Sequence, residues 1–328
     1  MAVQKTRFHF LSASKENVTL NCFKYVDETK IPVGVVLVTH GLSENIEMFE
    51  DQAVFLAENG YICAGMDFLG HGTTNGPGCV GITPDDTNEA IWKDMFTLYR
   101  MLKDEYPDLP MFSFSHSMGS MMVRTFLAMY GDQLDFRACF FTGDSHLPSF
   151  THRLVPAANL LGRLLTRYPK DLEKRRASFH LTDYGQHPPL YRRIPLLWLS
   201  LSQQNITNYI NNPYSGGANA DLRHVITFVV KALSCFAYAD QPGWAGKIPD
   251  GTVLHHGCGQ WDVPGLLGFG PKLIHRDLLK AGKKTELHLY KRAMHEVHAE
   301  MGIREEFHRD LLKLFNDNNP LLSNSLAG

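Results

Sequence analysis

Apolar and polar residues alternate near the start of the chain, in two runs that each predict an amphipathic strand. Phe8 and Phe10 alternate with polar neighbours, and residues 18–22 repeat the pattern a few positions later. Two such runs in succession are typical of a hairpin with one buried face. The next run, residues 33–39, is apolar on both faces. A strand of that kind is expected in the middle of a sheet that is covered on both sides.

Short apolar strands then alternate with amphipathic helices along most of the chain. Ile91, Met95 and Leu98, for example, recur at the spacing of one helix face. Repeated alternation of this type predicts an α/β protein, with a mostly parallel central sheet and helices on both faces. The further predicted strands are residues 61–66, 111–115, 138–142, 252–256 and 285–290, and the predicted helices are residues 48–59, 91–102, 118–130, 273–281 and 300–315.

The alternation is interrupted once, by a segment of residues 145–247 that is rich in Leu, Arg, Tyr and Pro and predicts several short helices. Strands and helices resume after it. We therefore expect one domain, formed by residues 1–144 and 248–328, with residues 145–247 inserted as a helical cap.

The composition is that of a globular protein without a strong electrostatic field. Hydrophobic residues make up 44% of the chain, and 32 Lys and Arg balance 34 Asp and Glu. This balance argues against a nucleic-acid partner. The longest apolar run, residues 225–239, is interrupted by Lys231 and is too short to span a bilayer, and the first residues contain no apolar stretch of signal-peptide length. Six scattered cysteines without metal-ligand spacing indicate free thiols in a reducing compartment, so a cytoplasmic location is expected.

The candidate nucleophile is Ser117. It lies where the predicted strand 111–115 turns into the predicted helix 118–130, and its neighbours at two positions before and after, Ser115 and Gly119, are small. A serine at such a turn is held in a strained conformation that exposes its hydroxyl, and the following helix adds a positive dipole end. The motif is S-x-S-x-G, in place of the usual G-x-S-x-G. An ordinary N-cap serine is the alternative interpretation.

A serine needs a general base to become a nucleophile, and the chain has 16 histidines from which to choose. His295 follows the predicted strand 285–290 by a few residues and precedes the last helix, so its loop is expected at the same edge of the sheet as Ser117. His298, close by, is the alternative.

When the nucleophile is a serine at a strand-to-helix turn, the acid that orients the base is expected before the histidine in the chain. Asp262 follows the predicted strand 252–256 and is our candidate, since an aspartate there is placed to accept the second ring nitrogen of His295. Asp144, after the preceding strand, is the rival acid.

The oxyanion of an acyl-transfer reaction needs two backbone donors. The residue after the nucleophile, Met118, is expected to supply one. The other is expected from Leu42, in the loop that follows the buried strand 33–39, because Gly41 lets the backbone approach closely.

These residues, read together, resemble the monoglyceride lipase and bacterial lysophospholipase group of α/β-hydrolases, also described as serine aminopeptidase-like. The likeness covers essentially the whole chain, and its most specific segments are V-L-V-T-H-G-L-S-E-N, M-D-F-L-G-H-G-T-T-N-G, F-S-H-S-M-G-S and R-A-M-H-E. The resemblance implies that Ser117, Asp262 and His295 form the catalytic triad, that Leu42 and Met118 form the oxyanion hole, and that no metal or organic cofactor takes part.

The expected activity is hydrolysis of the carboxylic ester of a single-chain lipid, a monoacylglycerol or a lysophospholipid. An aminopeptidase or amidase, a carboxylesterase for small esters, and a ligand-binding protein without activity are the alternatives. Leucines in the predicted cap favour an acyl site or a transient contact with a membrane surface, and basic residues favour a phosphate head group; either set also fits ordinary packing or solvation. The two sets are Leu154, Leu160, Leu161, Leu164, Leu165, Leu196, Leu197 and Leu199, and Arg163, Arg167, Lys174, Arg175, Arg176, Arg192 and Arg193.

Overall fold

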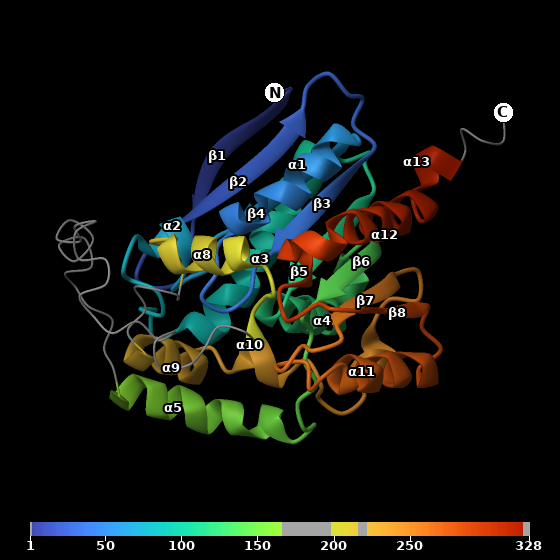
Figure 1. Ribbon diagram of the computed structural model, residues 1–328. Coiled ribbons are helices and arrows are strands. Elements are labelled where there is room, and N and C mark those ends of the chain that lie inside the picture. Colours follow the sequence, from blue (N-terminus) through green and yellow to red (C-terminus); the bar gives the residue numbers. More distant parts are fainter. Residues whose placement is uncertain (1, 166–197, 216–221, 324–328) are drawn as a thin grey trace.

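The computed structural model describes residues 2–165, 198–215 and 222–323, and its centre is an eight-stranded sheet (Figure 1). The spatial order of the strands is β1-β2-β4-β3-β5-β6-β7-β8. The strands are β1 (Val3–Leu11), β2 (Thr19–Asp27), β3 (Gly34–Thr39), β4 (Tyr61–Met66), β5 (Met111–His116), β6 (Phe136–Thr142), β7 (Val253–Gly259) and β8 (Thr285–Tyr290).

The strand directions confirm the predicted mostly parallel sheet. β1 pairs antiparallel with β2, and β2 pairs antiparallel with β4, which is the hairpin-like start that the alternating pattern indicated. All pairs from β4 to β8 are parallel. Every residue of β3 is buried, as expected for a central strand whose side chains are apolar on both faces.

Helices cover both faces of the sheet and enclose two apolar clusters. Leu56 of α1 (Glu50–Glu58) and Phe307 of α12 (Arg304–Asp317) belong to the cluster on one face. The helices α3 (Thr87–Glu105), α4 (Met118–Tyr130) and α11 (Phe269–Lys280) contribute to the cluster on the other face, with Met95, Met122 and Ile274. The α/β class predicted from the sequence is confirmed, and the carboxyl ends of the parallel strands form one edge of the sheet, where the loops lie that position the candidate site.

Between β6 and β7, the described residues include the helices α5 (Val155–Leu165), α8 (Gln203–Asn211), α9 (Leu222–Lys231) and α10 (Ser234–Ala237). α5 packs on α9, and α10 packs on α4. Short elements complete the chain: α2 (Gly72–Asn75) after β4, and α13 (Pro320–Ser323) after α12. In the part of the chain that is described, no helix combines the length and apolar character needed to cross a bilayer.

Most of the basic residues and two of the leucines on which the head-group and acyl-site interpretations depended lie outside the described residues. They are Arg167, Lys174, Arg175, Arg176, Arg192, Arg193, Leu196 and Leu197, together with the side chains of Arg163 and Leu165.

Candidate active site

Ser117 occupies the sharp turn between β5 and α4. Its φ of 51° and ψ of −119° lie outside the regions that an L-residue adopts without strain. The Ser117 amide donates to the Thr142 carbonyl at 2.8 Å, which ties the turn to the end of β6. Gly119 makes the turn sterically feasible, because a Cβ there would lie 2.4 Å from the Thr39 carbonyl oxygen. Ser117 therefore lies at a strained strand-to-helix turn, and its role as the nucleophile stays a prediction.

Ser115 stands where the usual motif has its first glycine, and the sheet accommodates it. Its side chain is fully buried in β5, and its hydroxyl finds no hydrogen-bond partner in the described part of the chain. The added hydroxymethyl group thus fits sterically and leaves one polar atom unsatisfied, which has an energetic cost.

His295 joins Ser117 to Asp262 in a continuous chain of short contacts. Its Nε2 lies 2.9 Å from Ser117 Oγ, and its Nδ1 lies 2.9 Å from Asp262 Oδ1. The Asp262 carboxylate is fully buried and also accepts the Gly265 amide at 2.9 Å. With Nδ1–H bound to the carboxylate, the Nε2 lone pair faces the serine hydroxyl, which is the arrangement that a general base requires.

His298, the alternative base, has other neighbours. It is buried, its ring stacks on Phe49 with centroids 4.5 Å apart, and it packs on His116. Burial lowers the pKa of His298 to about 3, so its imidazole stays neutral.

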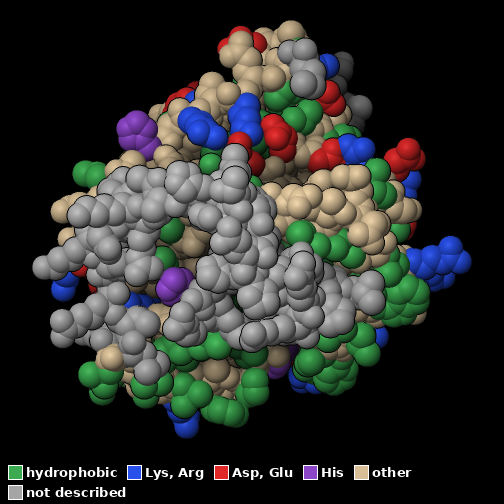
Figure 2. Space-filling model, turned by 60° about the vertical axis from the view of Figure 1, so that its left-hand side comes forward, with side chains coloured by type: hydrophobic (Ala, Val, Ile, Leu, Met, Phe, Trp, Pro, Cys, Tyr) green, Lys and Arg blue, Asp and Glu red, His purple; other side chains and the backbone are tan. Residues whose placement is uncertain are grey.

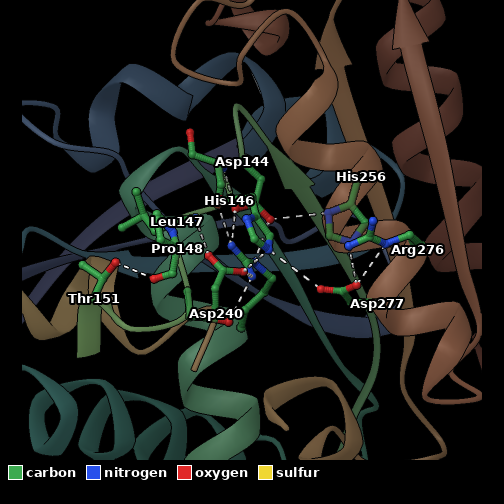
Figure 3. A network of polar contacts seen from close by, with 12 residues as sticks. Asp144, His146, Leu147, Pro148, Thr151, Asp240, His256, Arg276 and Asp277 are labelled. Carbon is green, nitrogen blue, oxygen red and sulfur yellow. Dashed lines mark hydrogen bonds and ion pairs between the residues drawn. The ribbon is translucent and has the colours of Figure 1, made fainter. Parts of the chain in front are cut away.

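Asp144, the alternative acid, lies in a network of polar contacts with Asp240 and His256 nearby (Figure 3), and it forms a buried ion pair with Arg124. Arg124 Nε lies 2.9 Å from Asp144 Oδ2, and Arg124 Nη1 lies 2.8 Å from Asp240 Oδ1. Burial by itself would raise the pKa of Asp144, but the charge of Arg124 and the contact with His256 lower it overall. Asp240 also accepts the Leu147 amide at 2.9 Å, so this network joins α4 to the segments on either side of the inserted helices.

The loop that carries Leu42 passes directly over the serine. A Cβ on Gly41 would lie only 3.0 Å from Ser117 Cβ, which shows how closely this backbone approaches. The Gly41 amide donates to Glu44 Oε2 at 2.6 Å, and this contact holds the loop in a tight turn. Leu42 follows Gly41 and Met118 begins α4, so both predicted oxyanion residues lie next to the candidate nucleophile.

Two buried acids beside the site were not predicted from the sequence. Glu44, in the loop just described, and Glu296, next to His295, are 3% and 0% exposed. Burial raises the pKa of Glu44 well above its usual range, and the nearby Glu296 raises it further; burial raises the pKa of Glu296 to about 7. Two neighbouring carboxyl groups that are both buried do not both ionise at neutral pH. Glu44 and Glu296 together therefore retain one proton.

Glu296 also connects the site to the inserted helices. Its carboxylate accepts the side-chain amide of Asn205 on α8, and its own amide donates to the Leu199 carbonyl at 2.8 Å. One position earlier, the His295 amide donates to the Trp198 carbonyl, and the two rings lie 5.7 Å apart. The only sequence signal for these contacts was the presence of a carboxylate directly after the candidate histidine.

A mostly parallel sheet with a strained serine at a strand-to-helix turn, and an acid and a histidine on later loops, is the architecture of an α/β-hydrolase. Residues 30–231 match the family model described as serine aminopeptidase S33 (Hydrolase_4), and the chain belongs to that family.

The proteins to which the chain is similar include a monoglyceride lipase homolog, a monoacylglycerol lipase and a solved carboxyl esterase. The chain is 28% identical over 97 residues to a monoglyceride lipase homolog of Monkeypox virus, and 28% identical over 141 residues to a monoacylglycerol lipase of Mycolicibacterium smegmatis. These matches cover 30% and 42% of this chain, and 34% and 48% of the relatives. The carboxyl esterase of Bacillus coagulans, solved in complex with glycerol, superimposes with a TM-score of 0.74 at 22% identity, over 97% of this chain and 99% of that one.

Proposed function

We propose that the chain is a serine hydrolase that cleaves carboxylic esters of single-chain lipids through an acyl-enzyme on Ser117. The observation that carries this proposal is the set of two 2.9 Å contacts that link Ser117 to His295 and His295 to Asp262 at a strained turn. The similarity to monoacylglycerol lipases supports the lipid substrate.

Acylation follows from the direction of the hydrogen bonds. His295 Nε2 takes the proton of Ser117 as its Oγ attacks the ester carbonyl, and the Asp262 carboxylate stabilises the imidazolium that forms. The backbone N–H groups of Leu42 and Met118 donate to the developing oxyanion, next to the N-terminus of α4. His295 then gives the proton to the leaving alcohol.

Deacylation repeats these steps with water. His295 takes a proton from the water as the water oxygen attacks the acyl carbonyl. The bond between the acyl carbon and Ser117 Oγ then breaks, His295 returns the proton to Ser117 Oγ, and the fatty acid leaves. This sequence uses only side chains and backbone groups of the protein, so no cofactor is proposed for it.

Residues 145–247 are proposed to form a cap over this site. In support, α8 contacts Glu296 through Asn205, and Trp198 lies against His295. Leu160, Leu161 and Leu164 of α5 are exposed. α5 lies at the bottom of Figure 1, and Figure 2, which is turned about the vertical axis, shows hydrophobic side chains along the lower edge of the molecule. We propose that this edge makes transient contact with a membrane surface from the cytoplasmic side, where the six buried free thiols would remain reduced.

The experiment that tests the substrate class is a panel of esters and amides at matched concentrations. Faster turnover of long-chain monoacylglycerols or lysophospholipids than of short acetates is expected. Equal or reversed rates would contradict the lipid assignment and favour a small-ester carboxylesterase. The family description also names an aminopeptidase, so the panel includes aminoacyl anilides. Turnover of these anilides without turnover of esters would favour an aminopeptidase.

A further inference from the structure

Three side chains with metal-binding chemistry meet on the last two strands of the sheet. His255 lies on β7, and Glu286 and His288 lie on β8. The parallel register sets His255 opposite Glu286, and His288 lies two residues further along the same strand, so all three project from one face. One ligand atom from each side chain lies within 4.8 Å of the other two.

The spacing of the two imidazoles suits a small tetrahedral ion. His288 Nε2 lies 3.3 Å from His255 Nδ1. Two nitrogen ligands at zinc distances of about 2.0–2.1 Å subtend a tetrahedral edge of about 3.3–3.4 Å. The Glu286 carboxylate lies beside both rings, with Oε1 3.7 Å from His288 Nε2 and Oε2 3.4 Å from His255 Nε2.

A second carboxylate orients one of the rings. Asp310 of α12 places Oδ2 3.6 Å from His288 Nδ1, and the Tyr290 hydroxyl donates to the same oxygen at 2.9 Å. A carboxylate behind one ring nitrogen favours the tautomer that carries its proton there, which leaves the Nε2 lone pair directed at His255. Phe140 stacks on the His288 ring with centroids 6.0 Å apart and limits its rotation.

The cluster is also accessible from solvent, as a metal site must be. The Glu286 side chain is 60% exposed, whereas those of His255 and His288 are 15% and 23% exposed. An ion therefore has an open path from solvent on the carboxylate side.

We propose that His255, Glu286 and His288 bind a divalent transition-metal ion, with zinc as the ion that this geometry suits and water as the fourth ligand. The ion joins β7 to β8. These two strands lead into the turns that carry Asp262 and His295, so metal binding stabilises the part of the sheet that holds both residues. The site does not depend on the proposed hydrolase activity.

Calorimetric titration of the tag-free full chain with zinc chloride tests this proposal. One zinc ion per chain is expected, with binding at least tenfold weaker in Glu286→Ala and lost in His288→Ala. At a zinc concentration of 100 times Kd, the wild-type Tm should rise by roughly 4 °C. His9→Ala is the matched control, because His9 is an exposed histidine on β1 at the opposite edge of the sheet, and it should bind as the wild type does.

Failure of the wild type to bind one zinc ion would overturn the proposal. Equal affinity of Glu286→Ala, His288→Ala and His9→Ala would also overturn it, because the ion would then bind elsewhere. If His288→Ala does not fold, Glu286→Ala still decides the question, since this side chain is largely exposed and its truncation leaves the core intact.

Discussion

His295 Nε2 lies 2.9 Å from Ser117 Oγ, although 178 positions of sequence separate the two residues. Because the strands from β5 to β8 all run parallel, the loops that follow β5 and β8 lie at the same edge of the sheet. Asp262 completes the arrangement from the end of β7. The loops after β5, β7 and β8 thus bring Ser117, Asp262 and His295 into one hydrogen-bonded chain. The chemical role of each residue can be tested by a separate substitution.

Replacement of Asp262 by Asn should lower kcat by roughly 10³–10⁴-fold, with little change in stability. The amide keeps the shape of the side chain, but it favours the wrong tautomer of His295 and cannot stabilise the imidazolium. Steady-state kinetics on a long-chain monoacyl ester would measure this loss. Asp144→Asn is the matched comparison, because Asp144 contacts Arg124 and not His295. A larger loss of kcat in a folded Asp144→Asn than in Asp262→Asn would contradict the assignment of the acid.

The alternation of apolar strands and amphipathic helices was enough to predict β3 through β8. The clearest signals came from β3 and β4, which are buried at every residue and almost entirely apolar. The last helix was predicted from residue 300 but begins at Arg304, after the two short 3₁₀ turns Val297–Ala299 and Met301–Ile303. These turns contain apolar residues and hide the start of the helix in the pattern.

Contacts between distant polar residues could not be predicted in the same way. Nothing local to Glu44 indicates that it lies near Glu296, and nothing local to Arg124 indicates two buried carboxylates around it. The choice between Asp262 and Asp144 stayed open in the sequence for the same reason: both follow a strand, and only the arrangement in space distinguishes their partners. The cluster of His255, Glu286 and His288 likewise depends on the register of β7 against β8.

Glu296→Gln should change the pH dependence of stability. Because the folded-state pKa values of Glu44 and Glu296 are raised, their contribution to stability is fully present below the unfolded pKa of about 4.5 and is lost as pH rises through about 7. Glutamine is neutral at every pH and keeps a hydrogen-bonding group toward Glu44 and Asn205. The variant should therefore gain stability relative to the wild type from pH 5 to pH 8, by up to about 3 kcal/mol.

Tm measured across this pH range for the wild type and for Glu296→Gln gives the difference in stability at each pH. The contributions of the other titrating groups are the same in both proteins and cancel in this difference. Glu305→Gln serves as the control, since its carboxylate is exposed on α12, and its difference from the wild type should stay flat. A flat difference for Glu296→Gln as well would show that the buried pair holds no shared proton.

Arg124→Met should destabilise the protein by about 3–5 kcal/mol, because it leaves Asp144 and Asp240 buried without their cation. Chemical denaturation would measure the effect. Arg137→Met is the matched surface variant: Arg137 pairs with Asp135, both side chains are about half exposed, and the loss should stay below about 1 kcal/mol. Similar losses in the two variants would mean that the network around Arg124 contributes no more than a surface pair.

Ser115→Ala should be neutral or stabilising, by up to about 1 kcal/mol, because it removes a buried hydroxyl that lacks a partner in the described structure. Ser113→Ala, two residues earlier on the same strand, should instead cost about 1 kcal/mol, because the equally buried Ser113 hydroxyl donates to the Leu37 carbonyl at 3.2 Å. Thermal unfolding of both variants compares them. A clear loss of stability in Ser115→Ala would show that its hydroxyl has a partner after all.

The central claim is that Ser117 is a nucleophile activated by His295, and labelling with a fluorophosphonate probe tests it most directly. The probe reacts with activated serines, and mass spectrometry of the digested protein identifies the labelled residue. Wild type, Ser117→Ala and Ser120→Ala should be compared; Ser120 lies one turn further along α4, and its hydroxyl is already bound to the Thr142 carbonyl. We predict labelling at Ser117 in the wild type and in Ser120→Ala, and none in Ser117→Ala. Folded wild-type protein that does not react at Ser117 would contradict the account and leave a binding protein as the better interpretation.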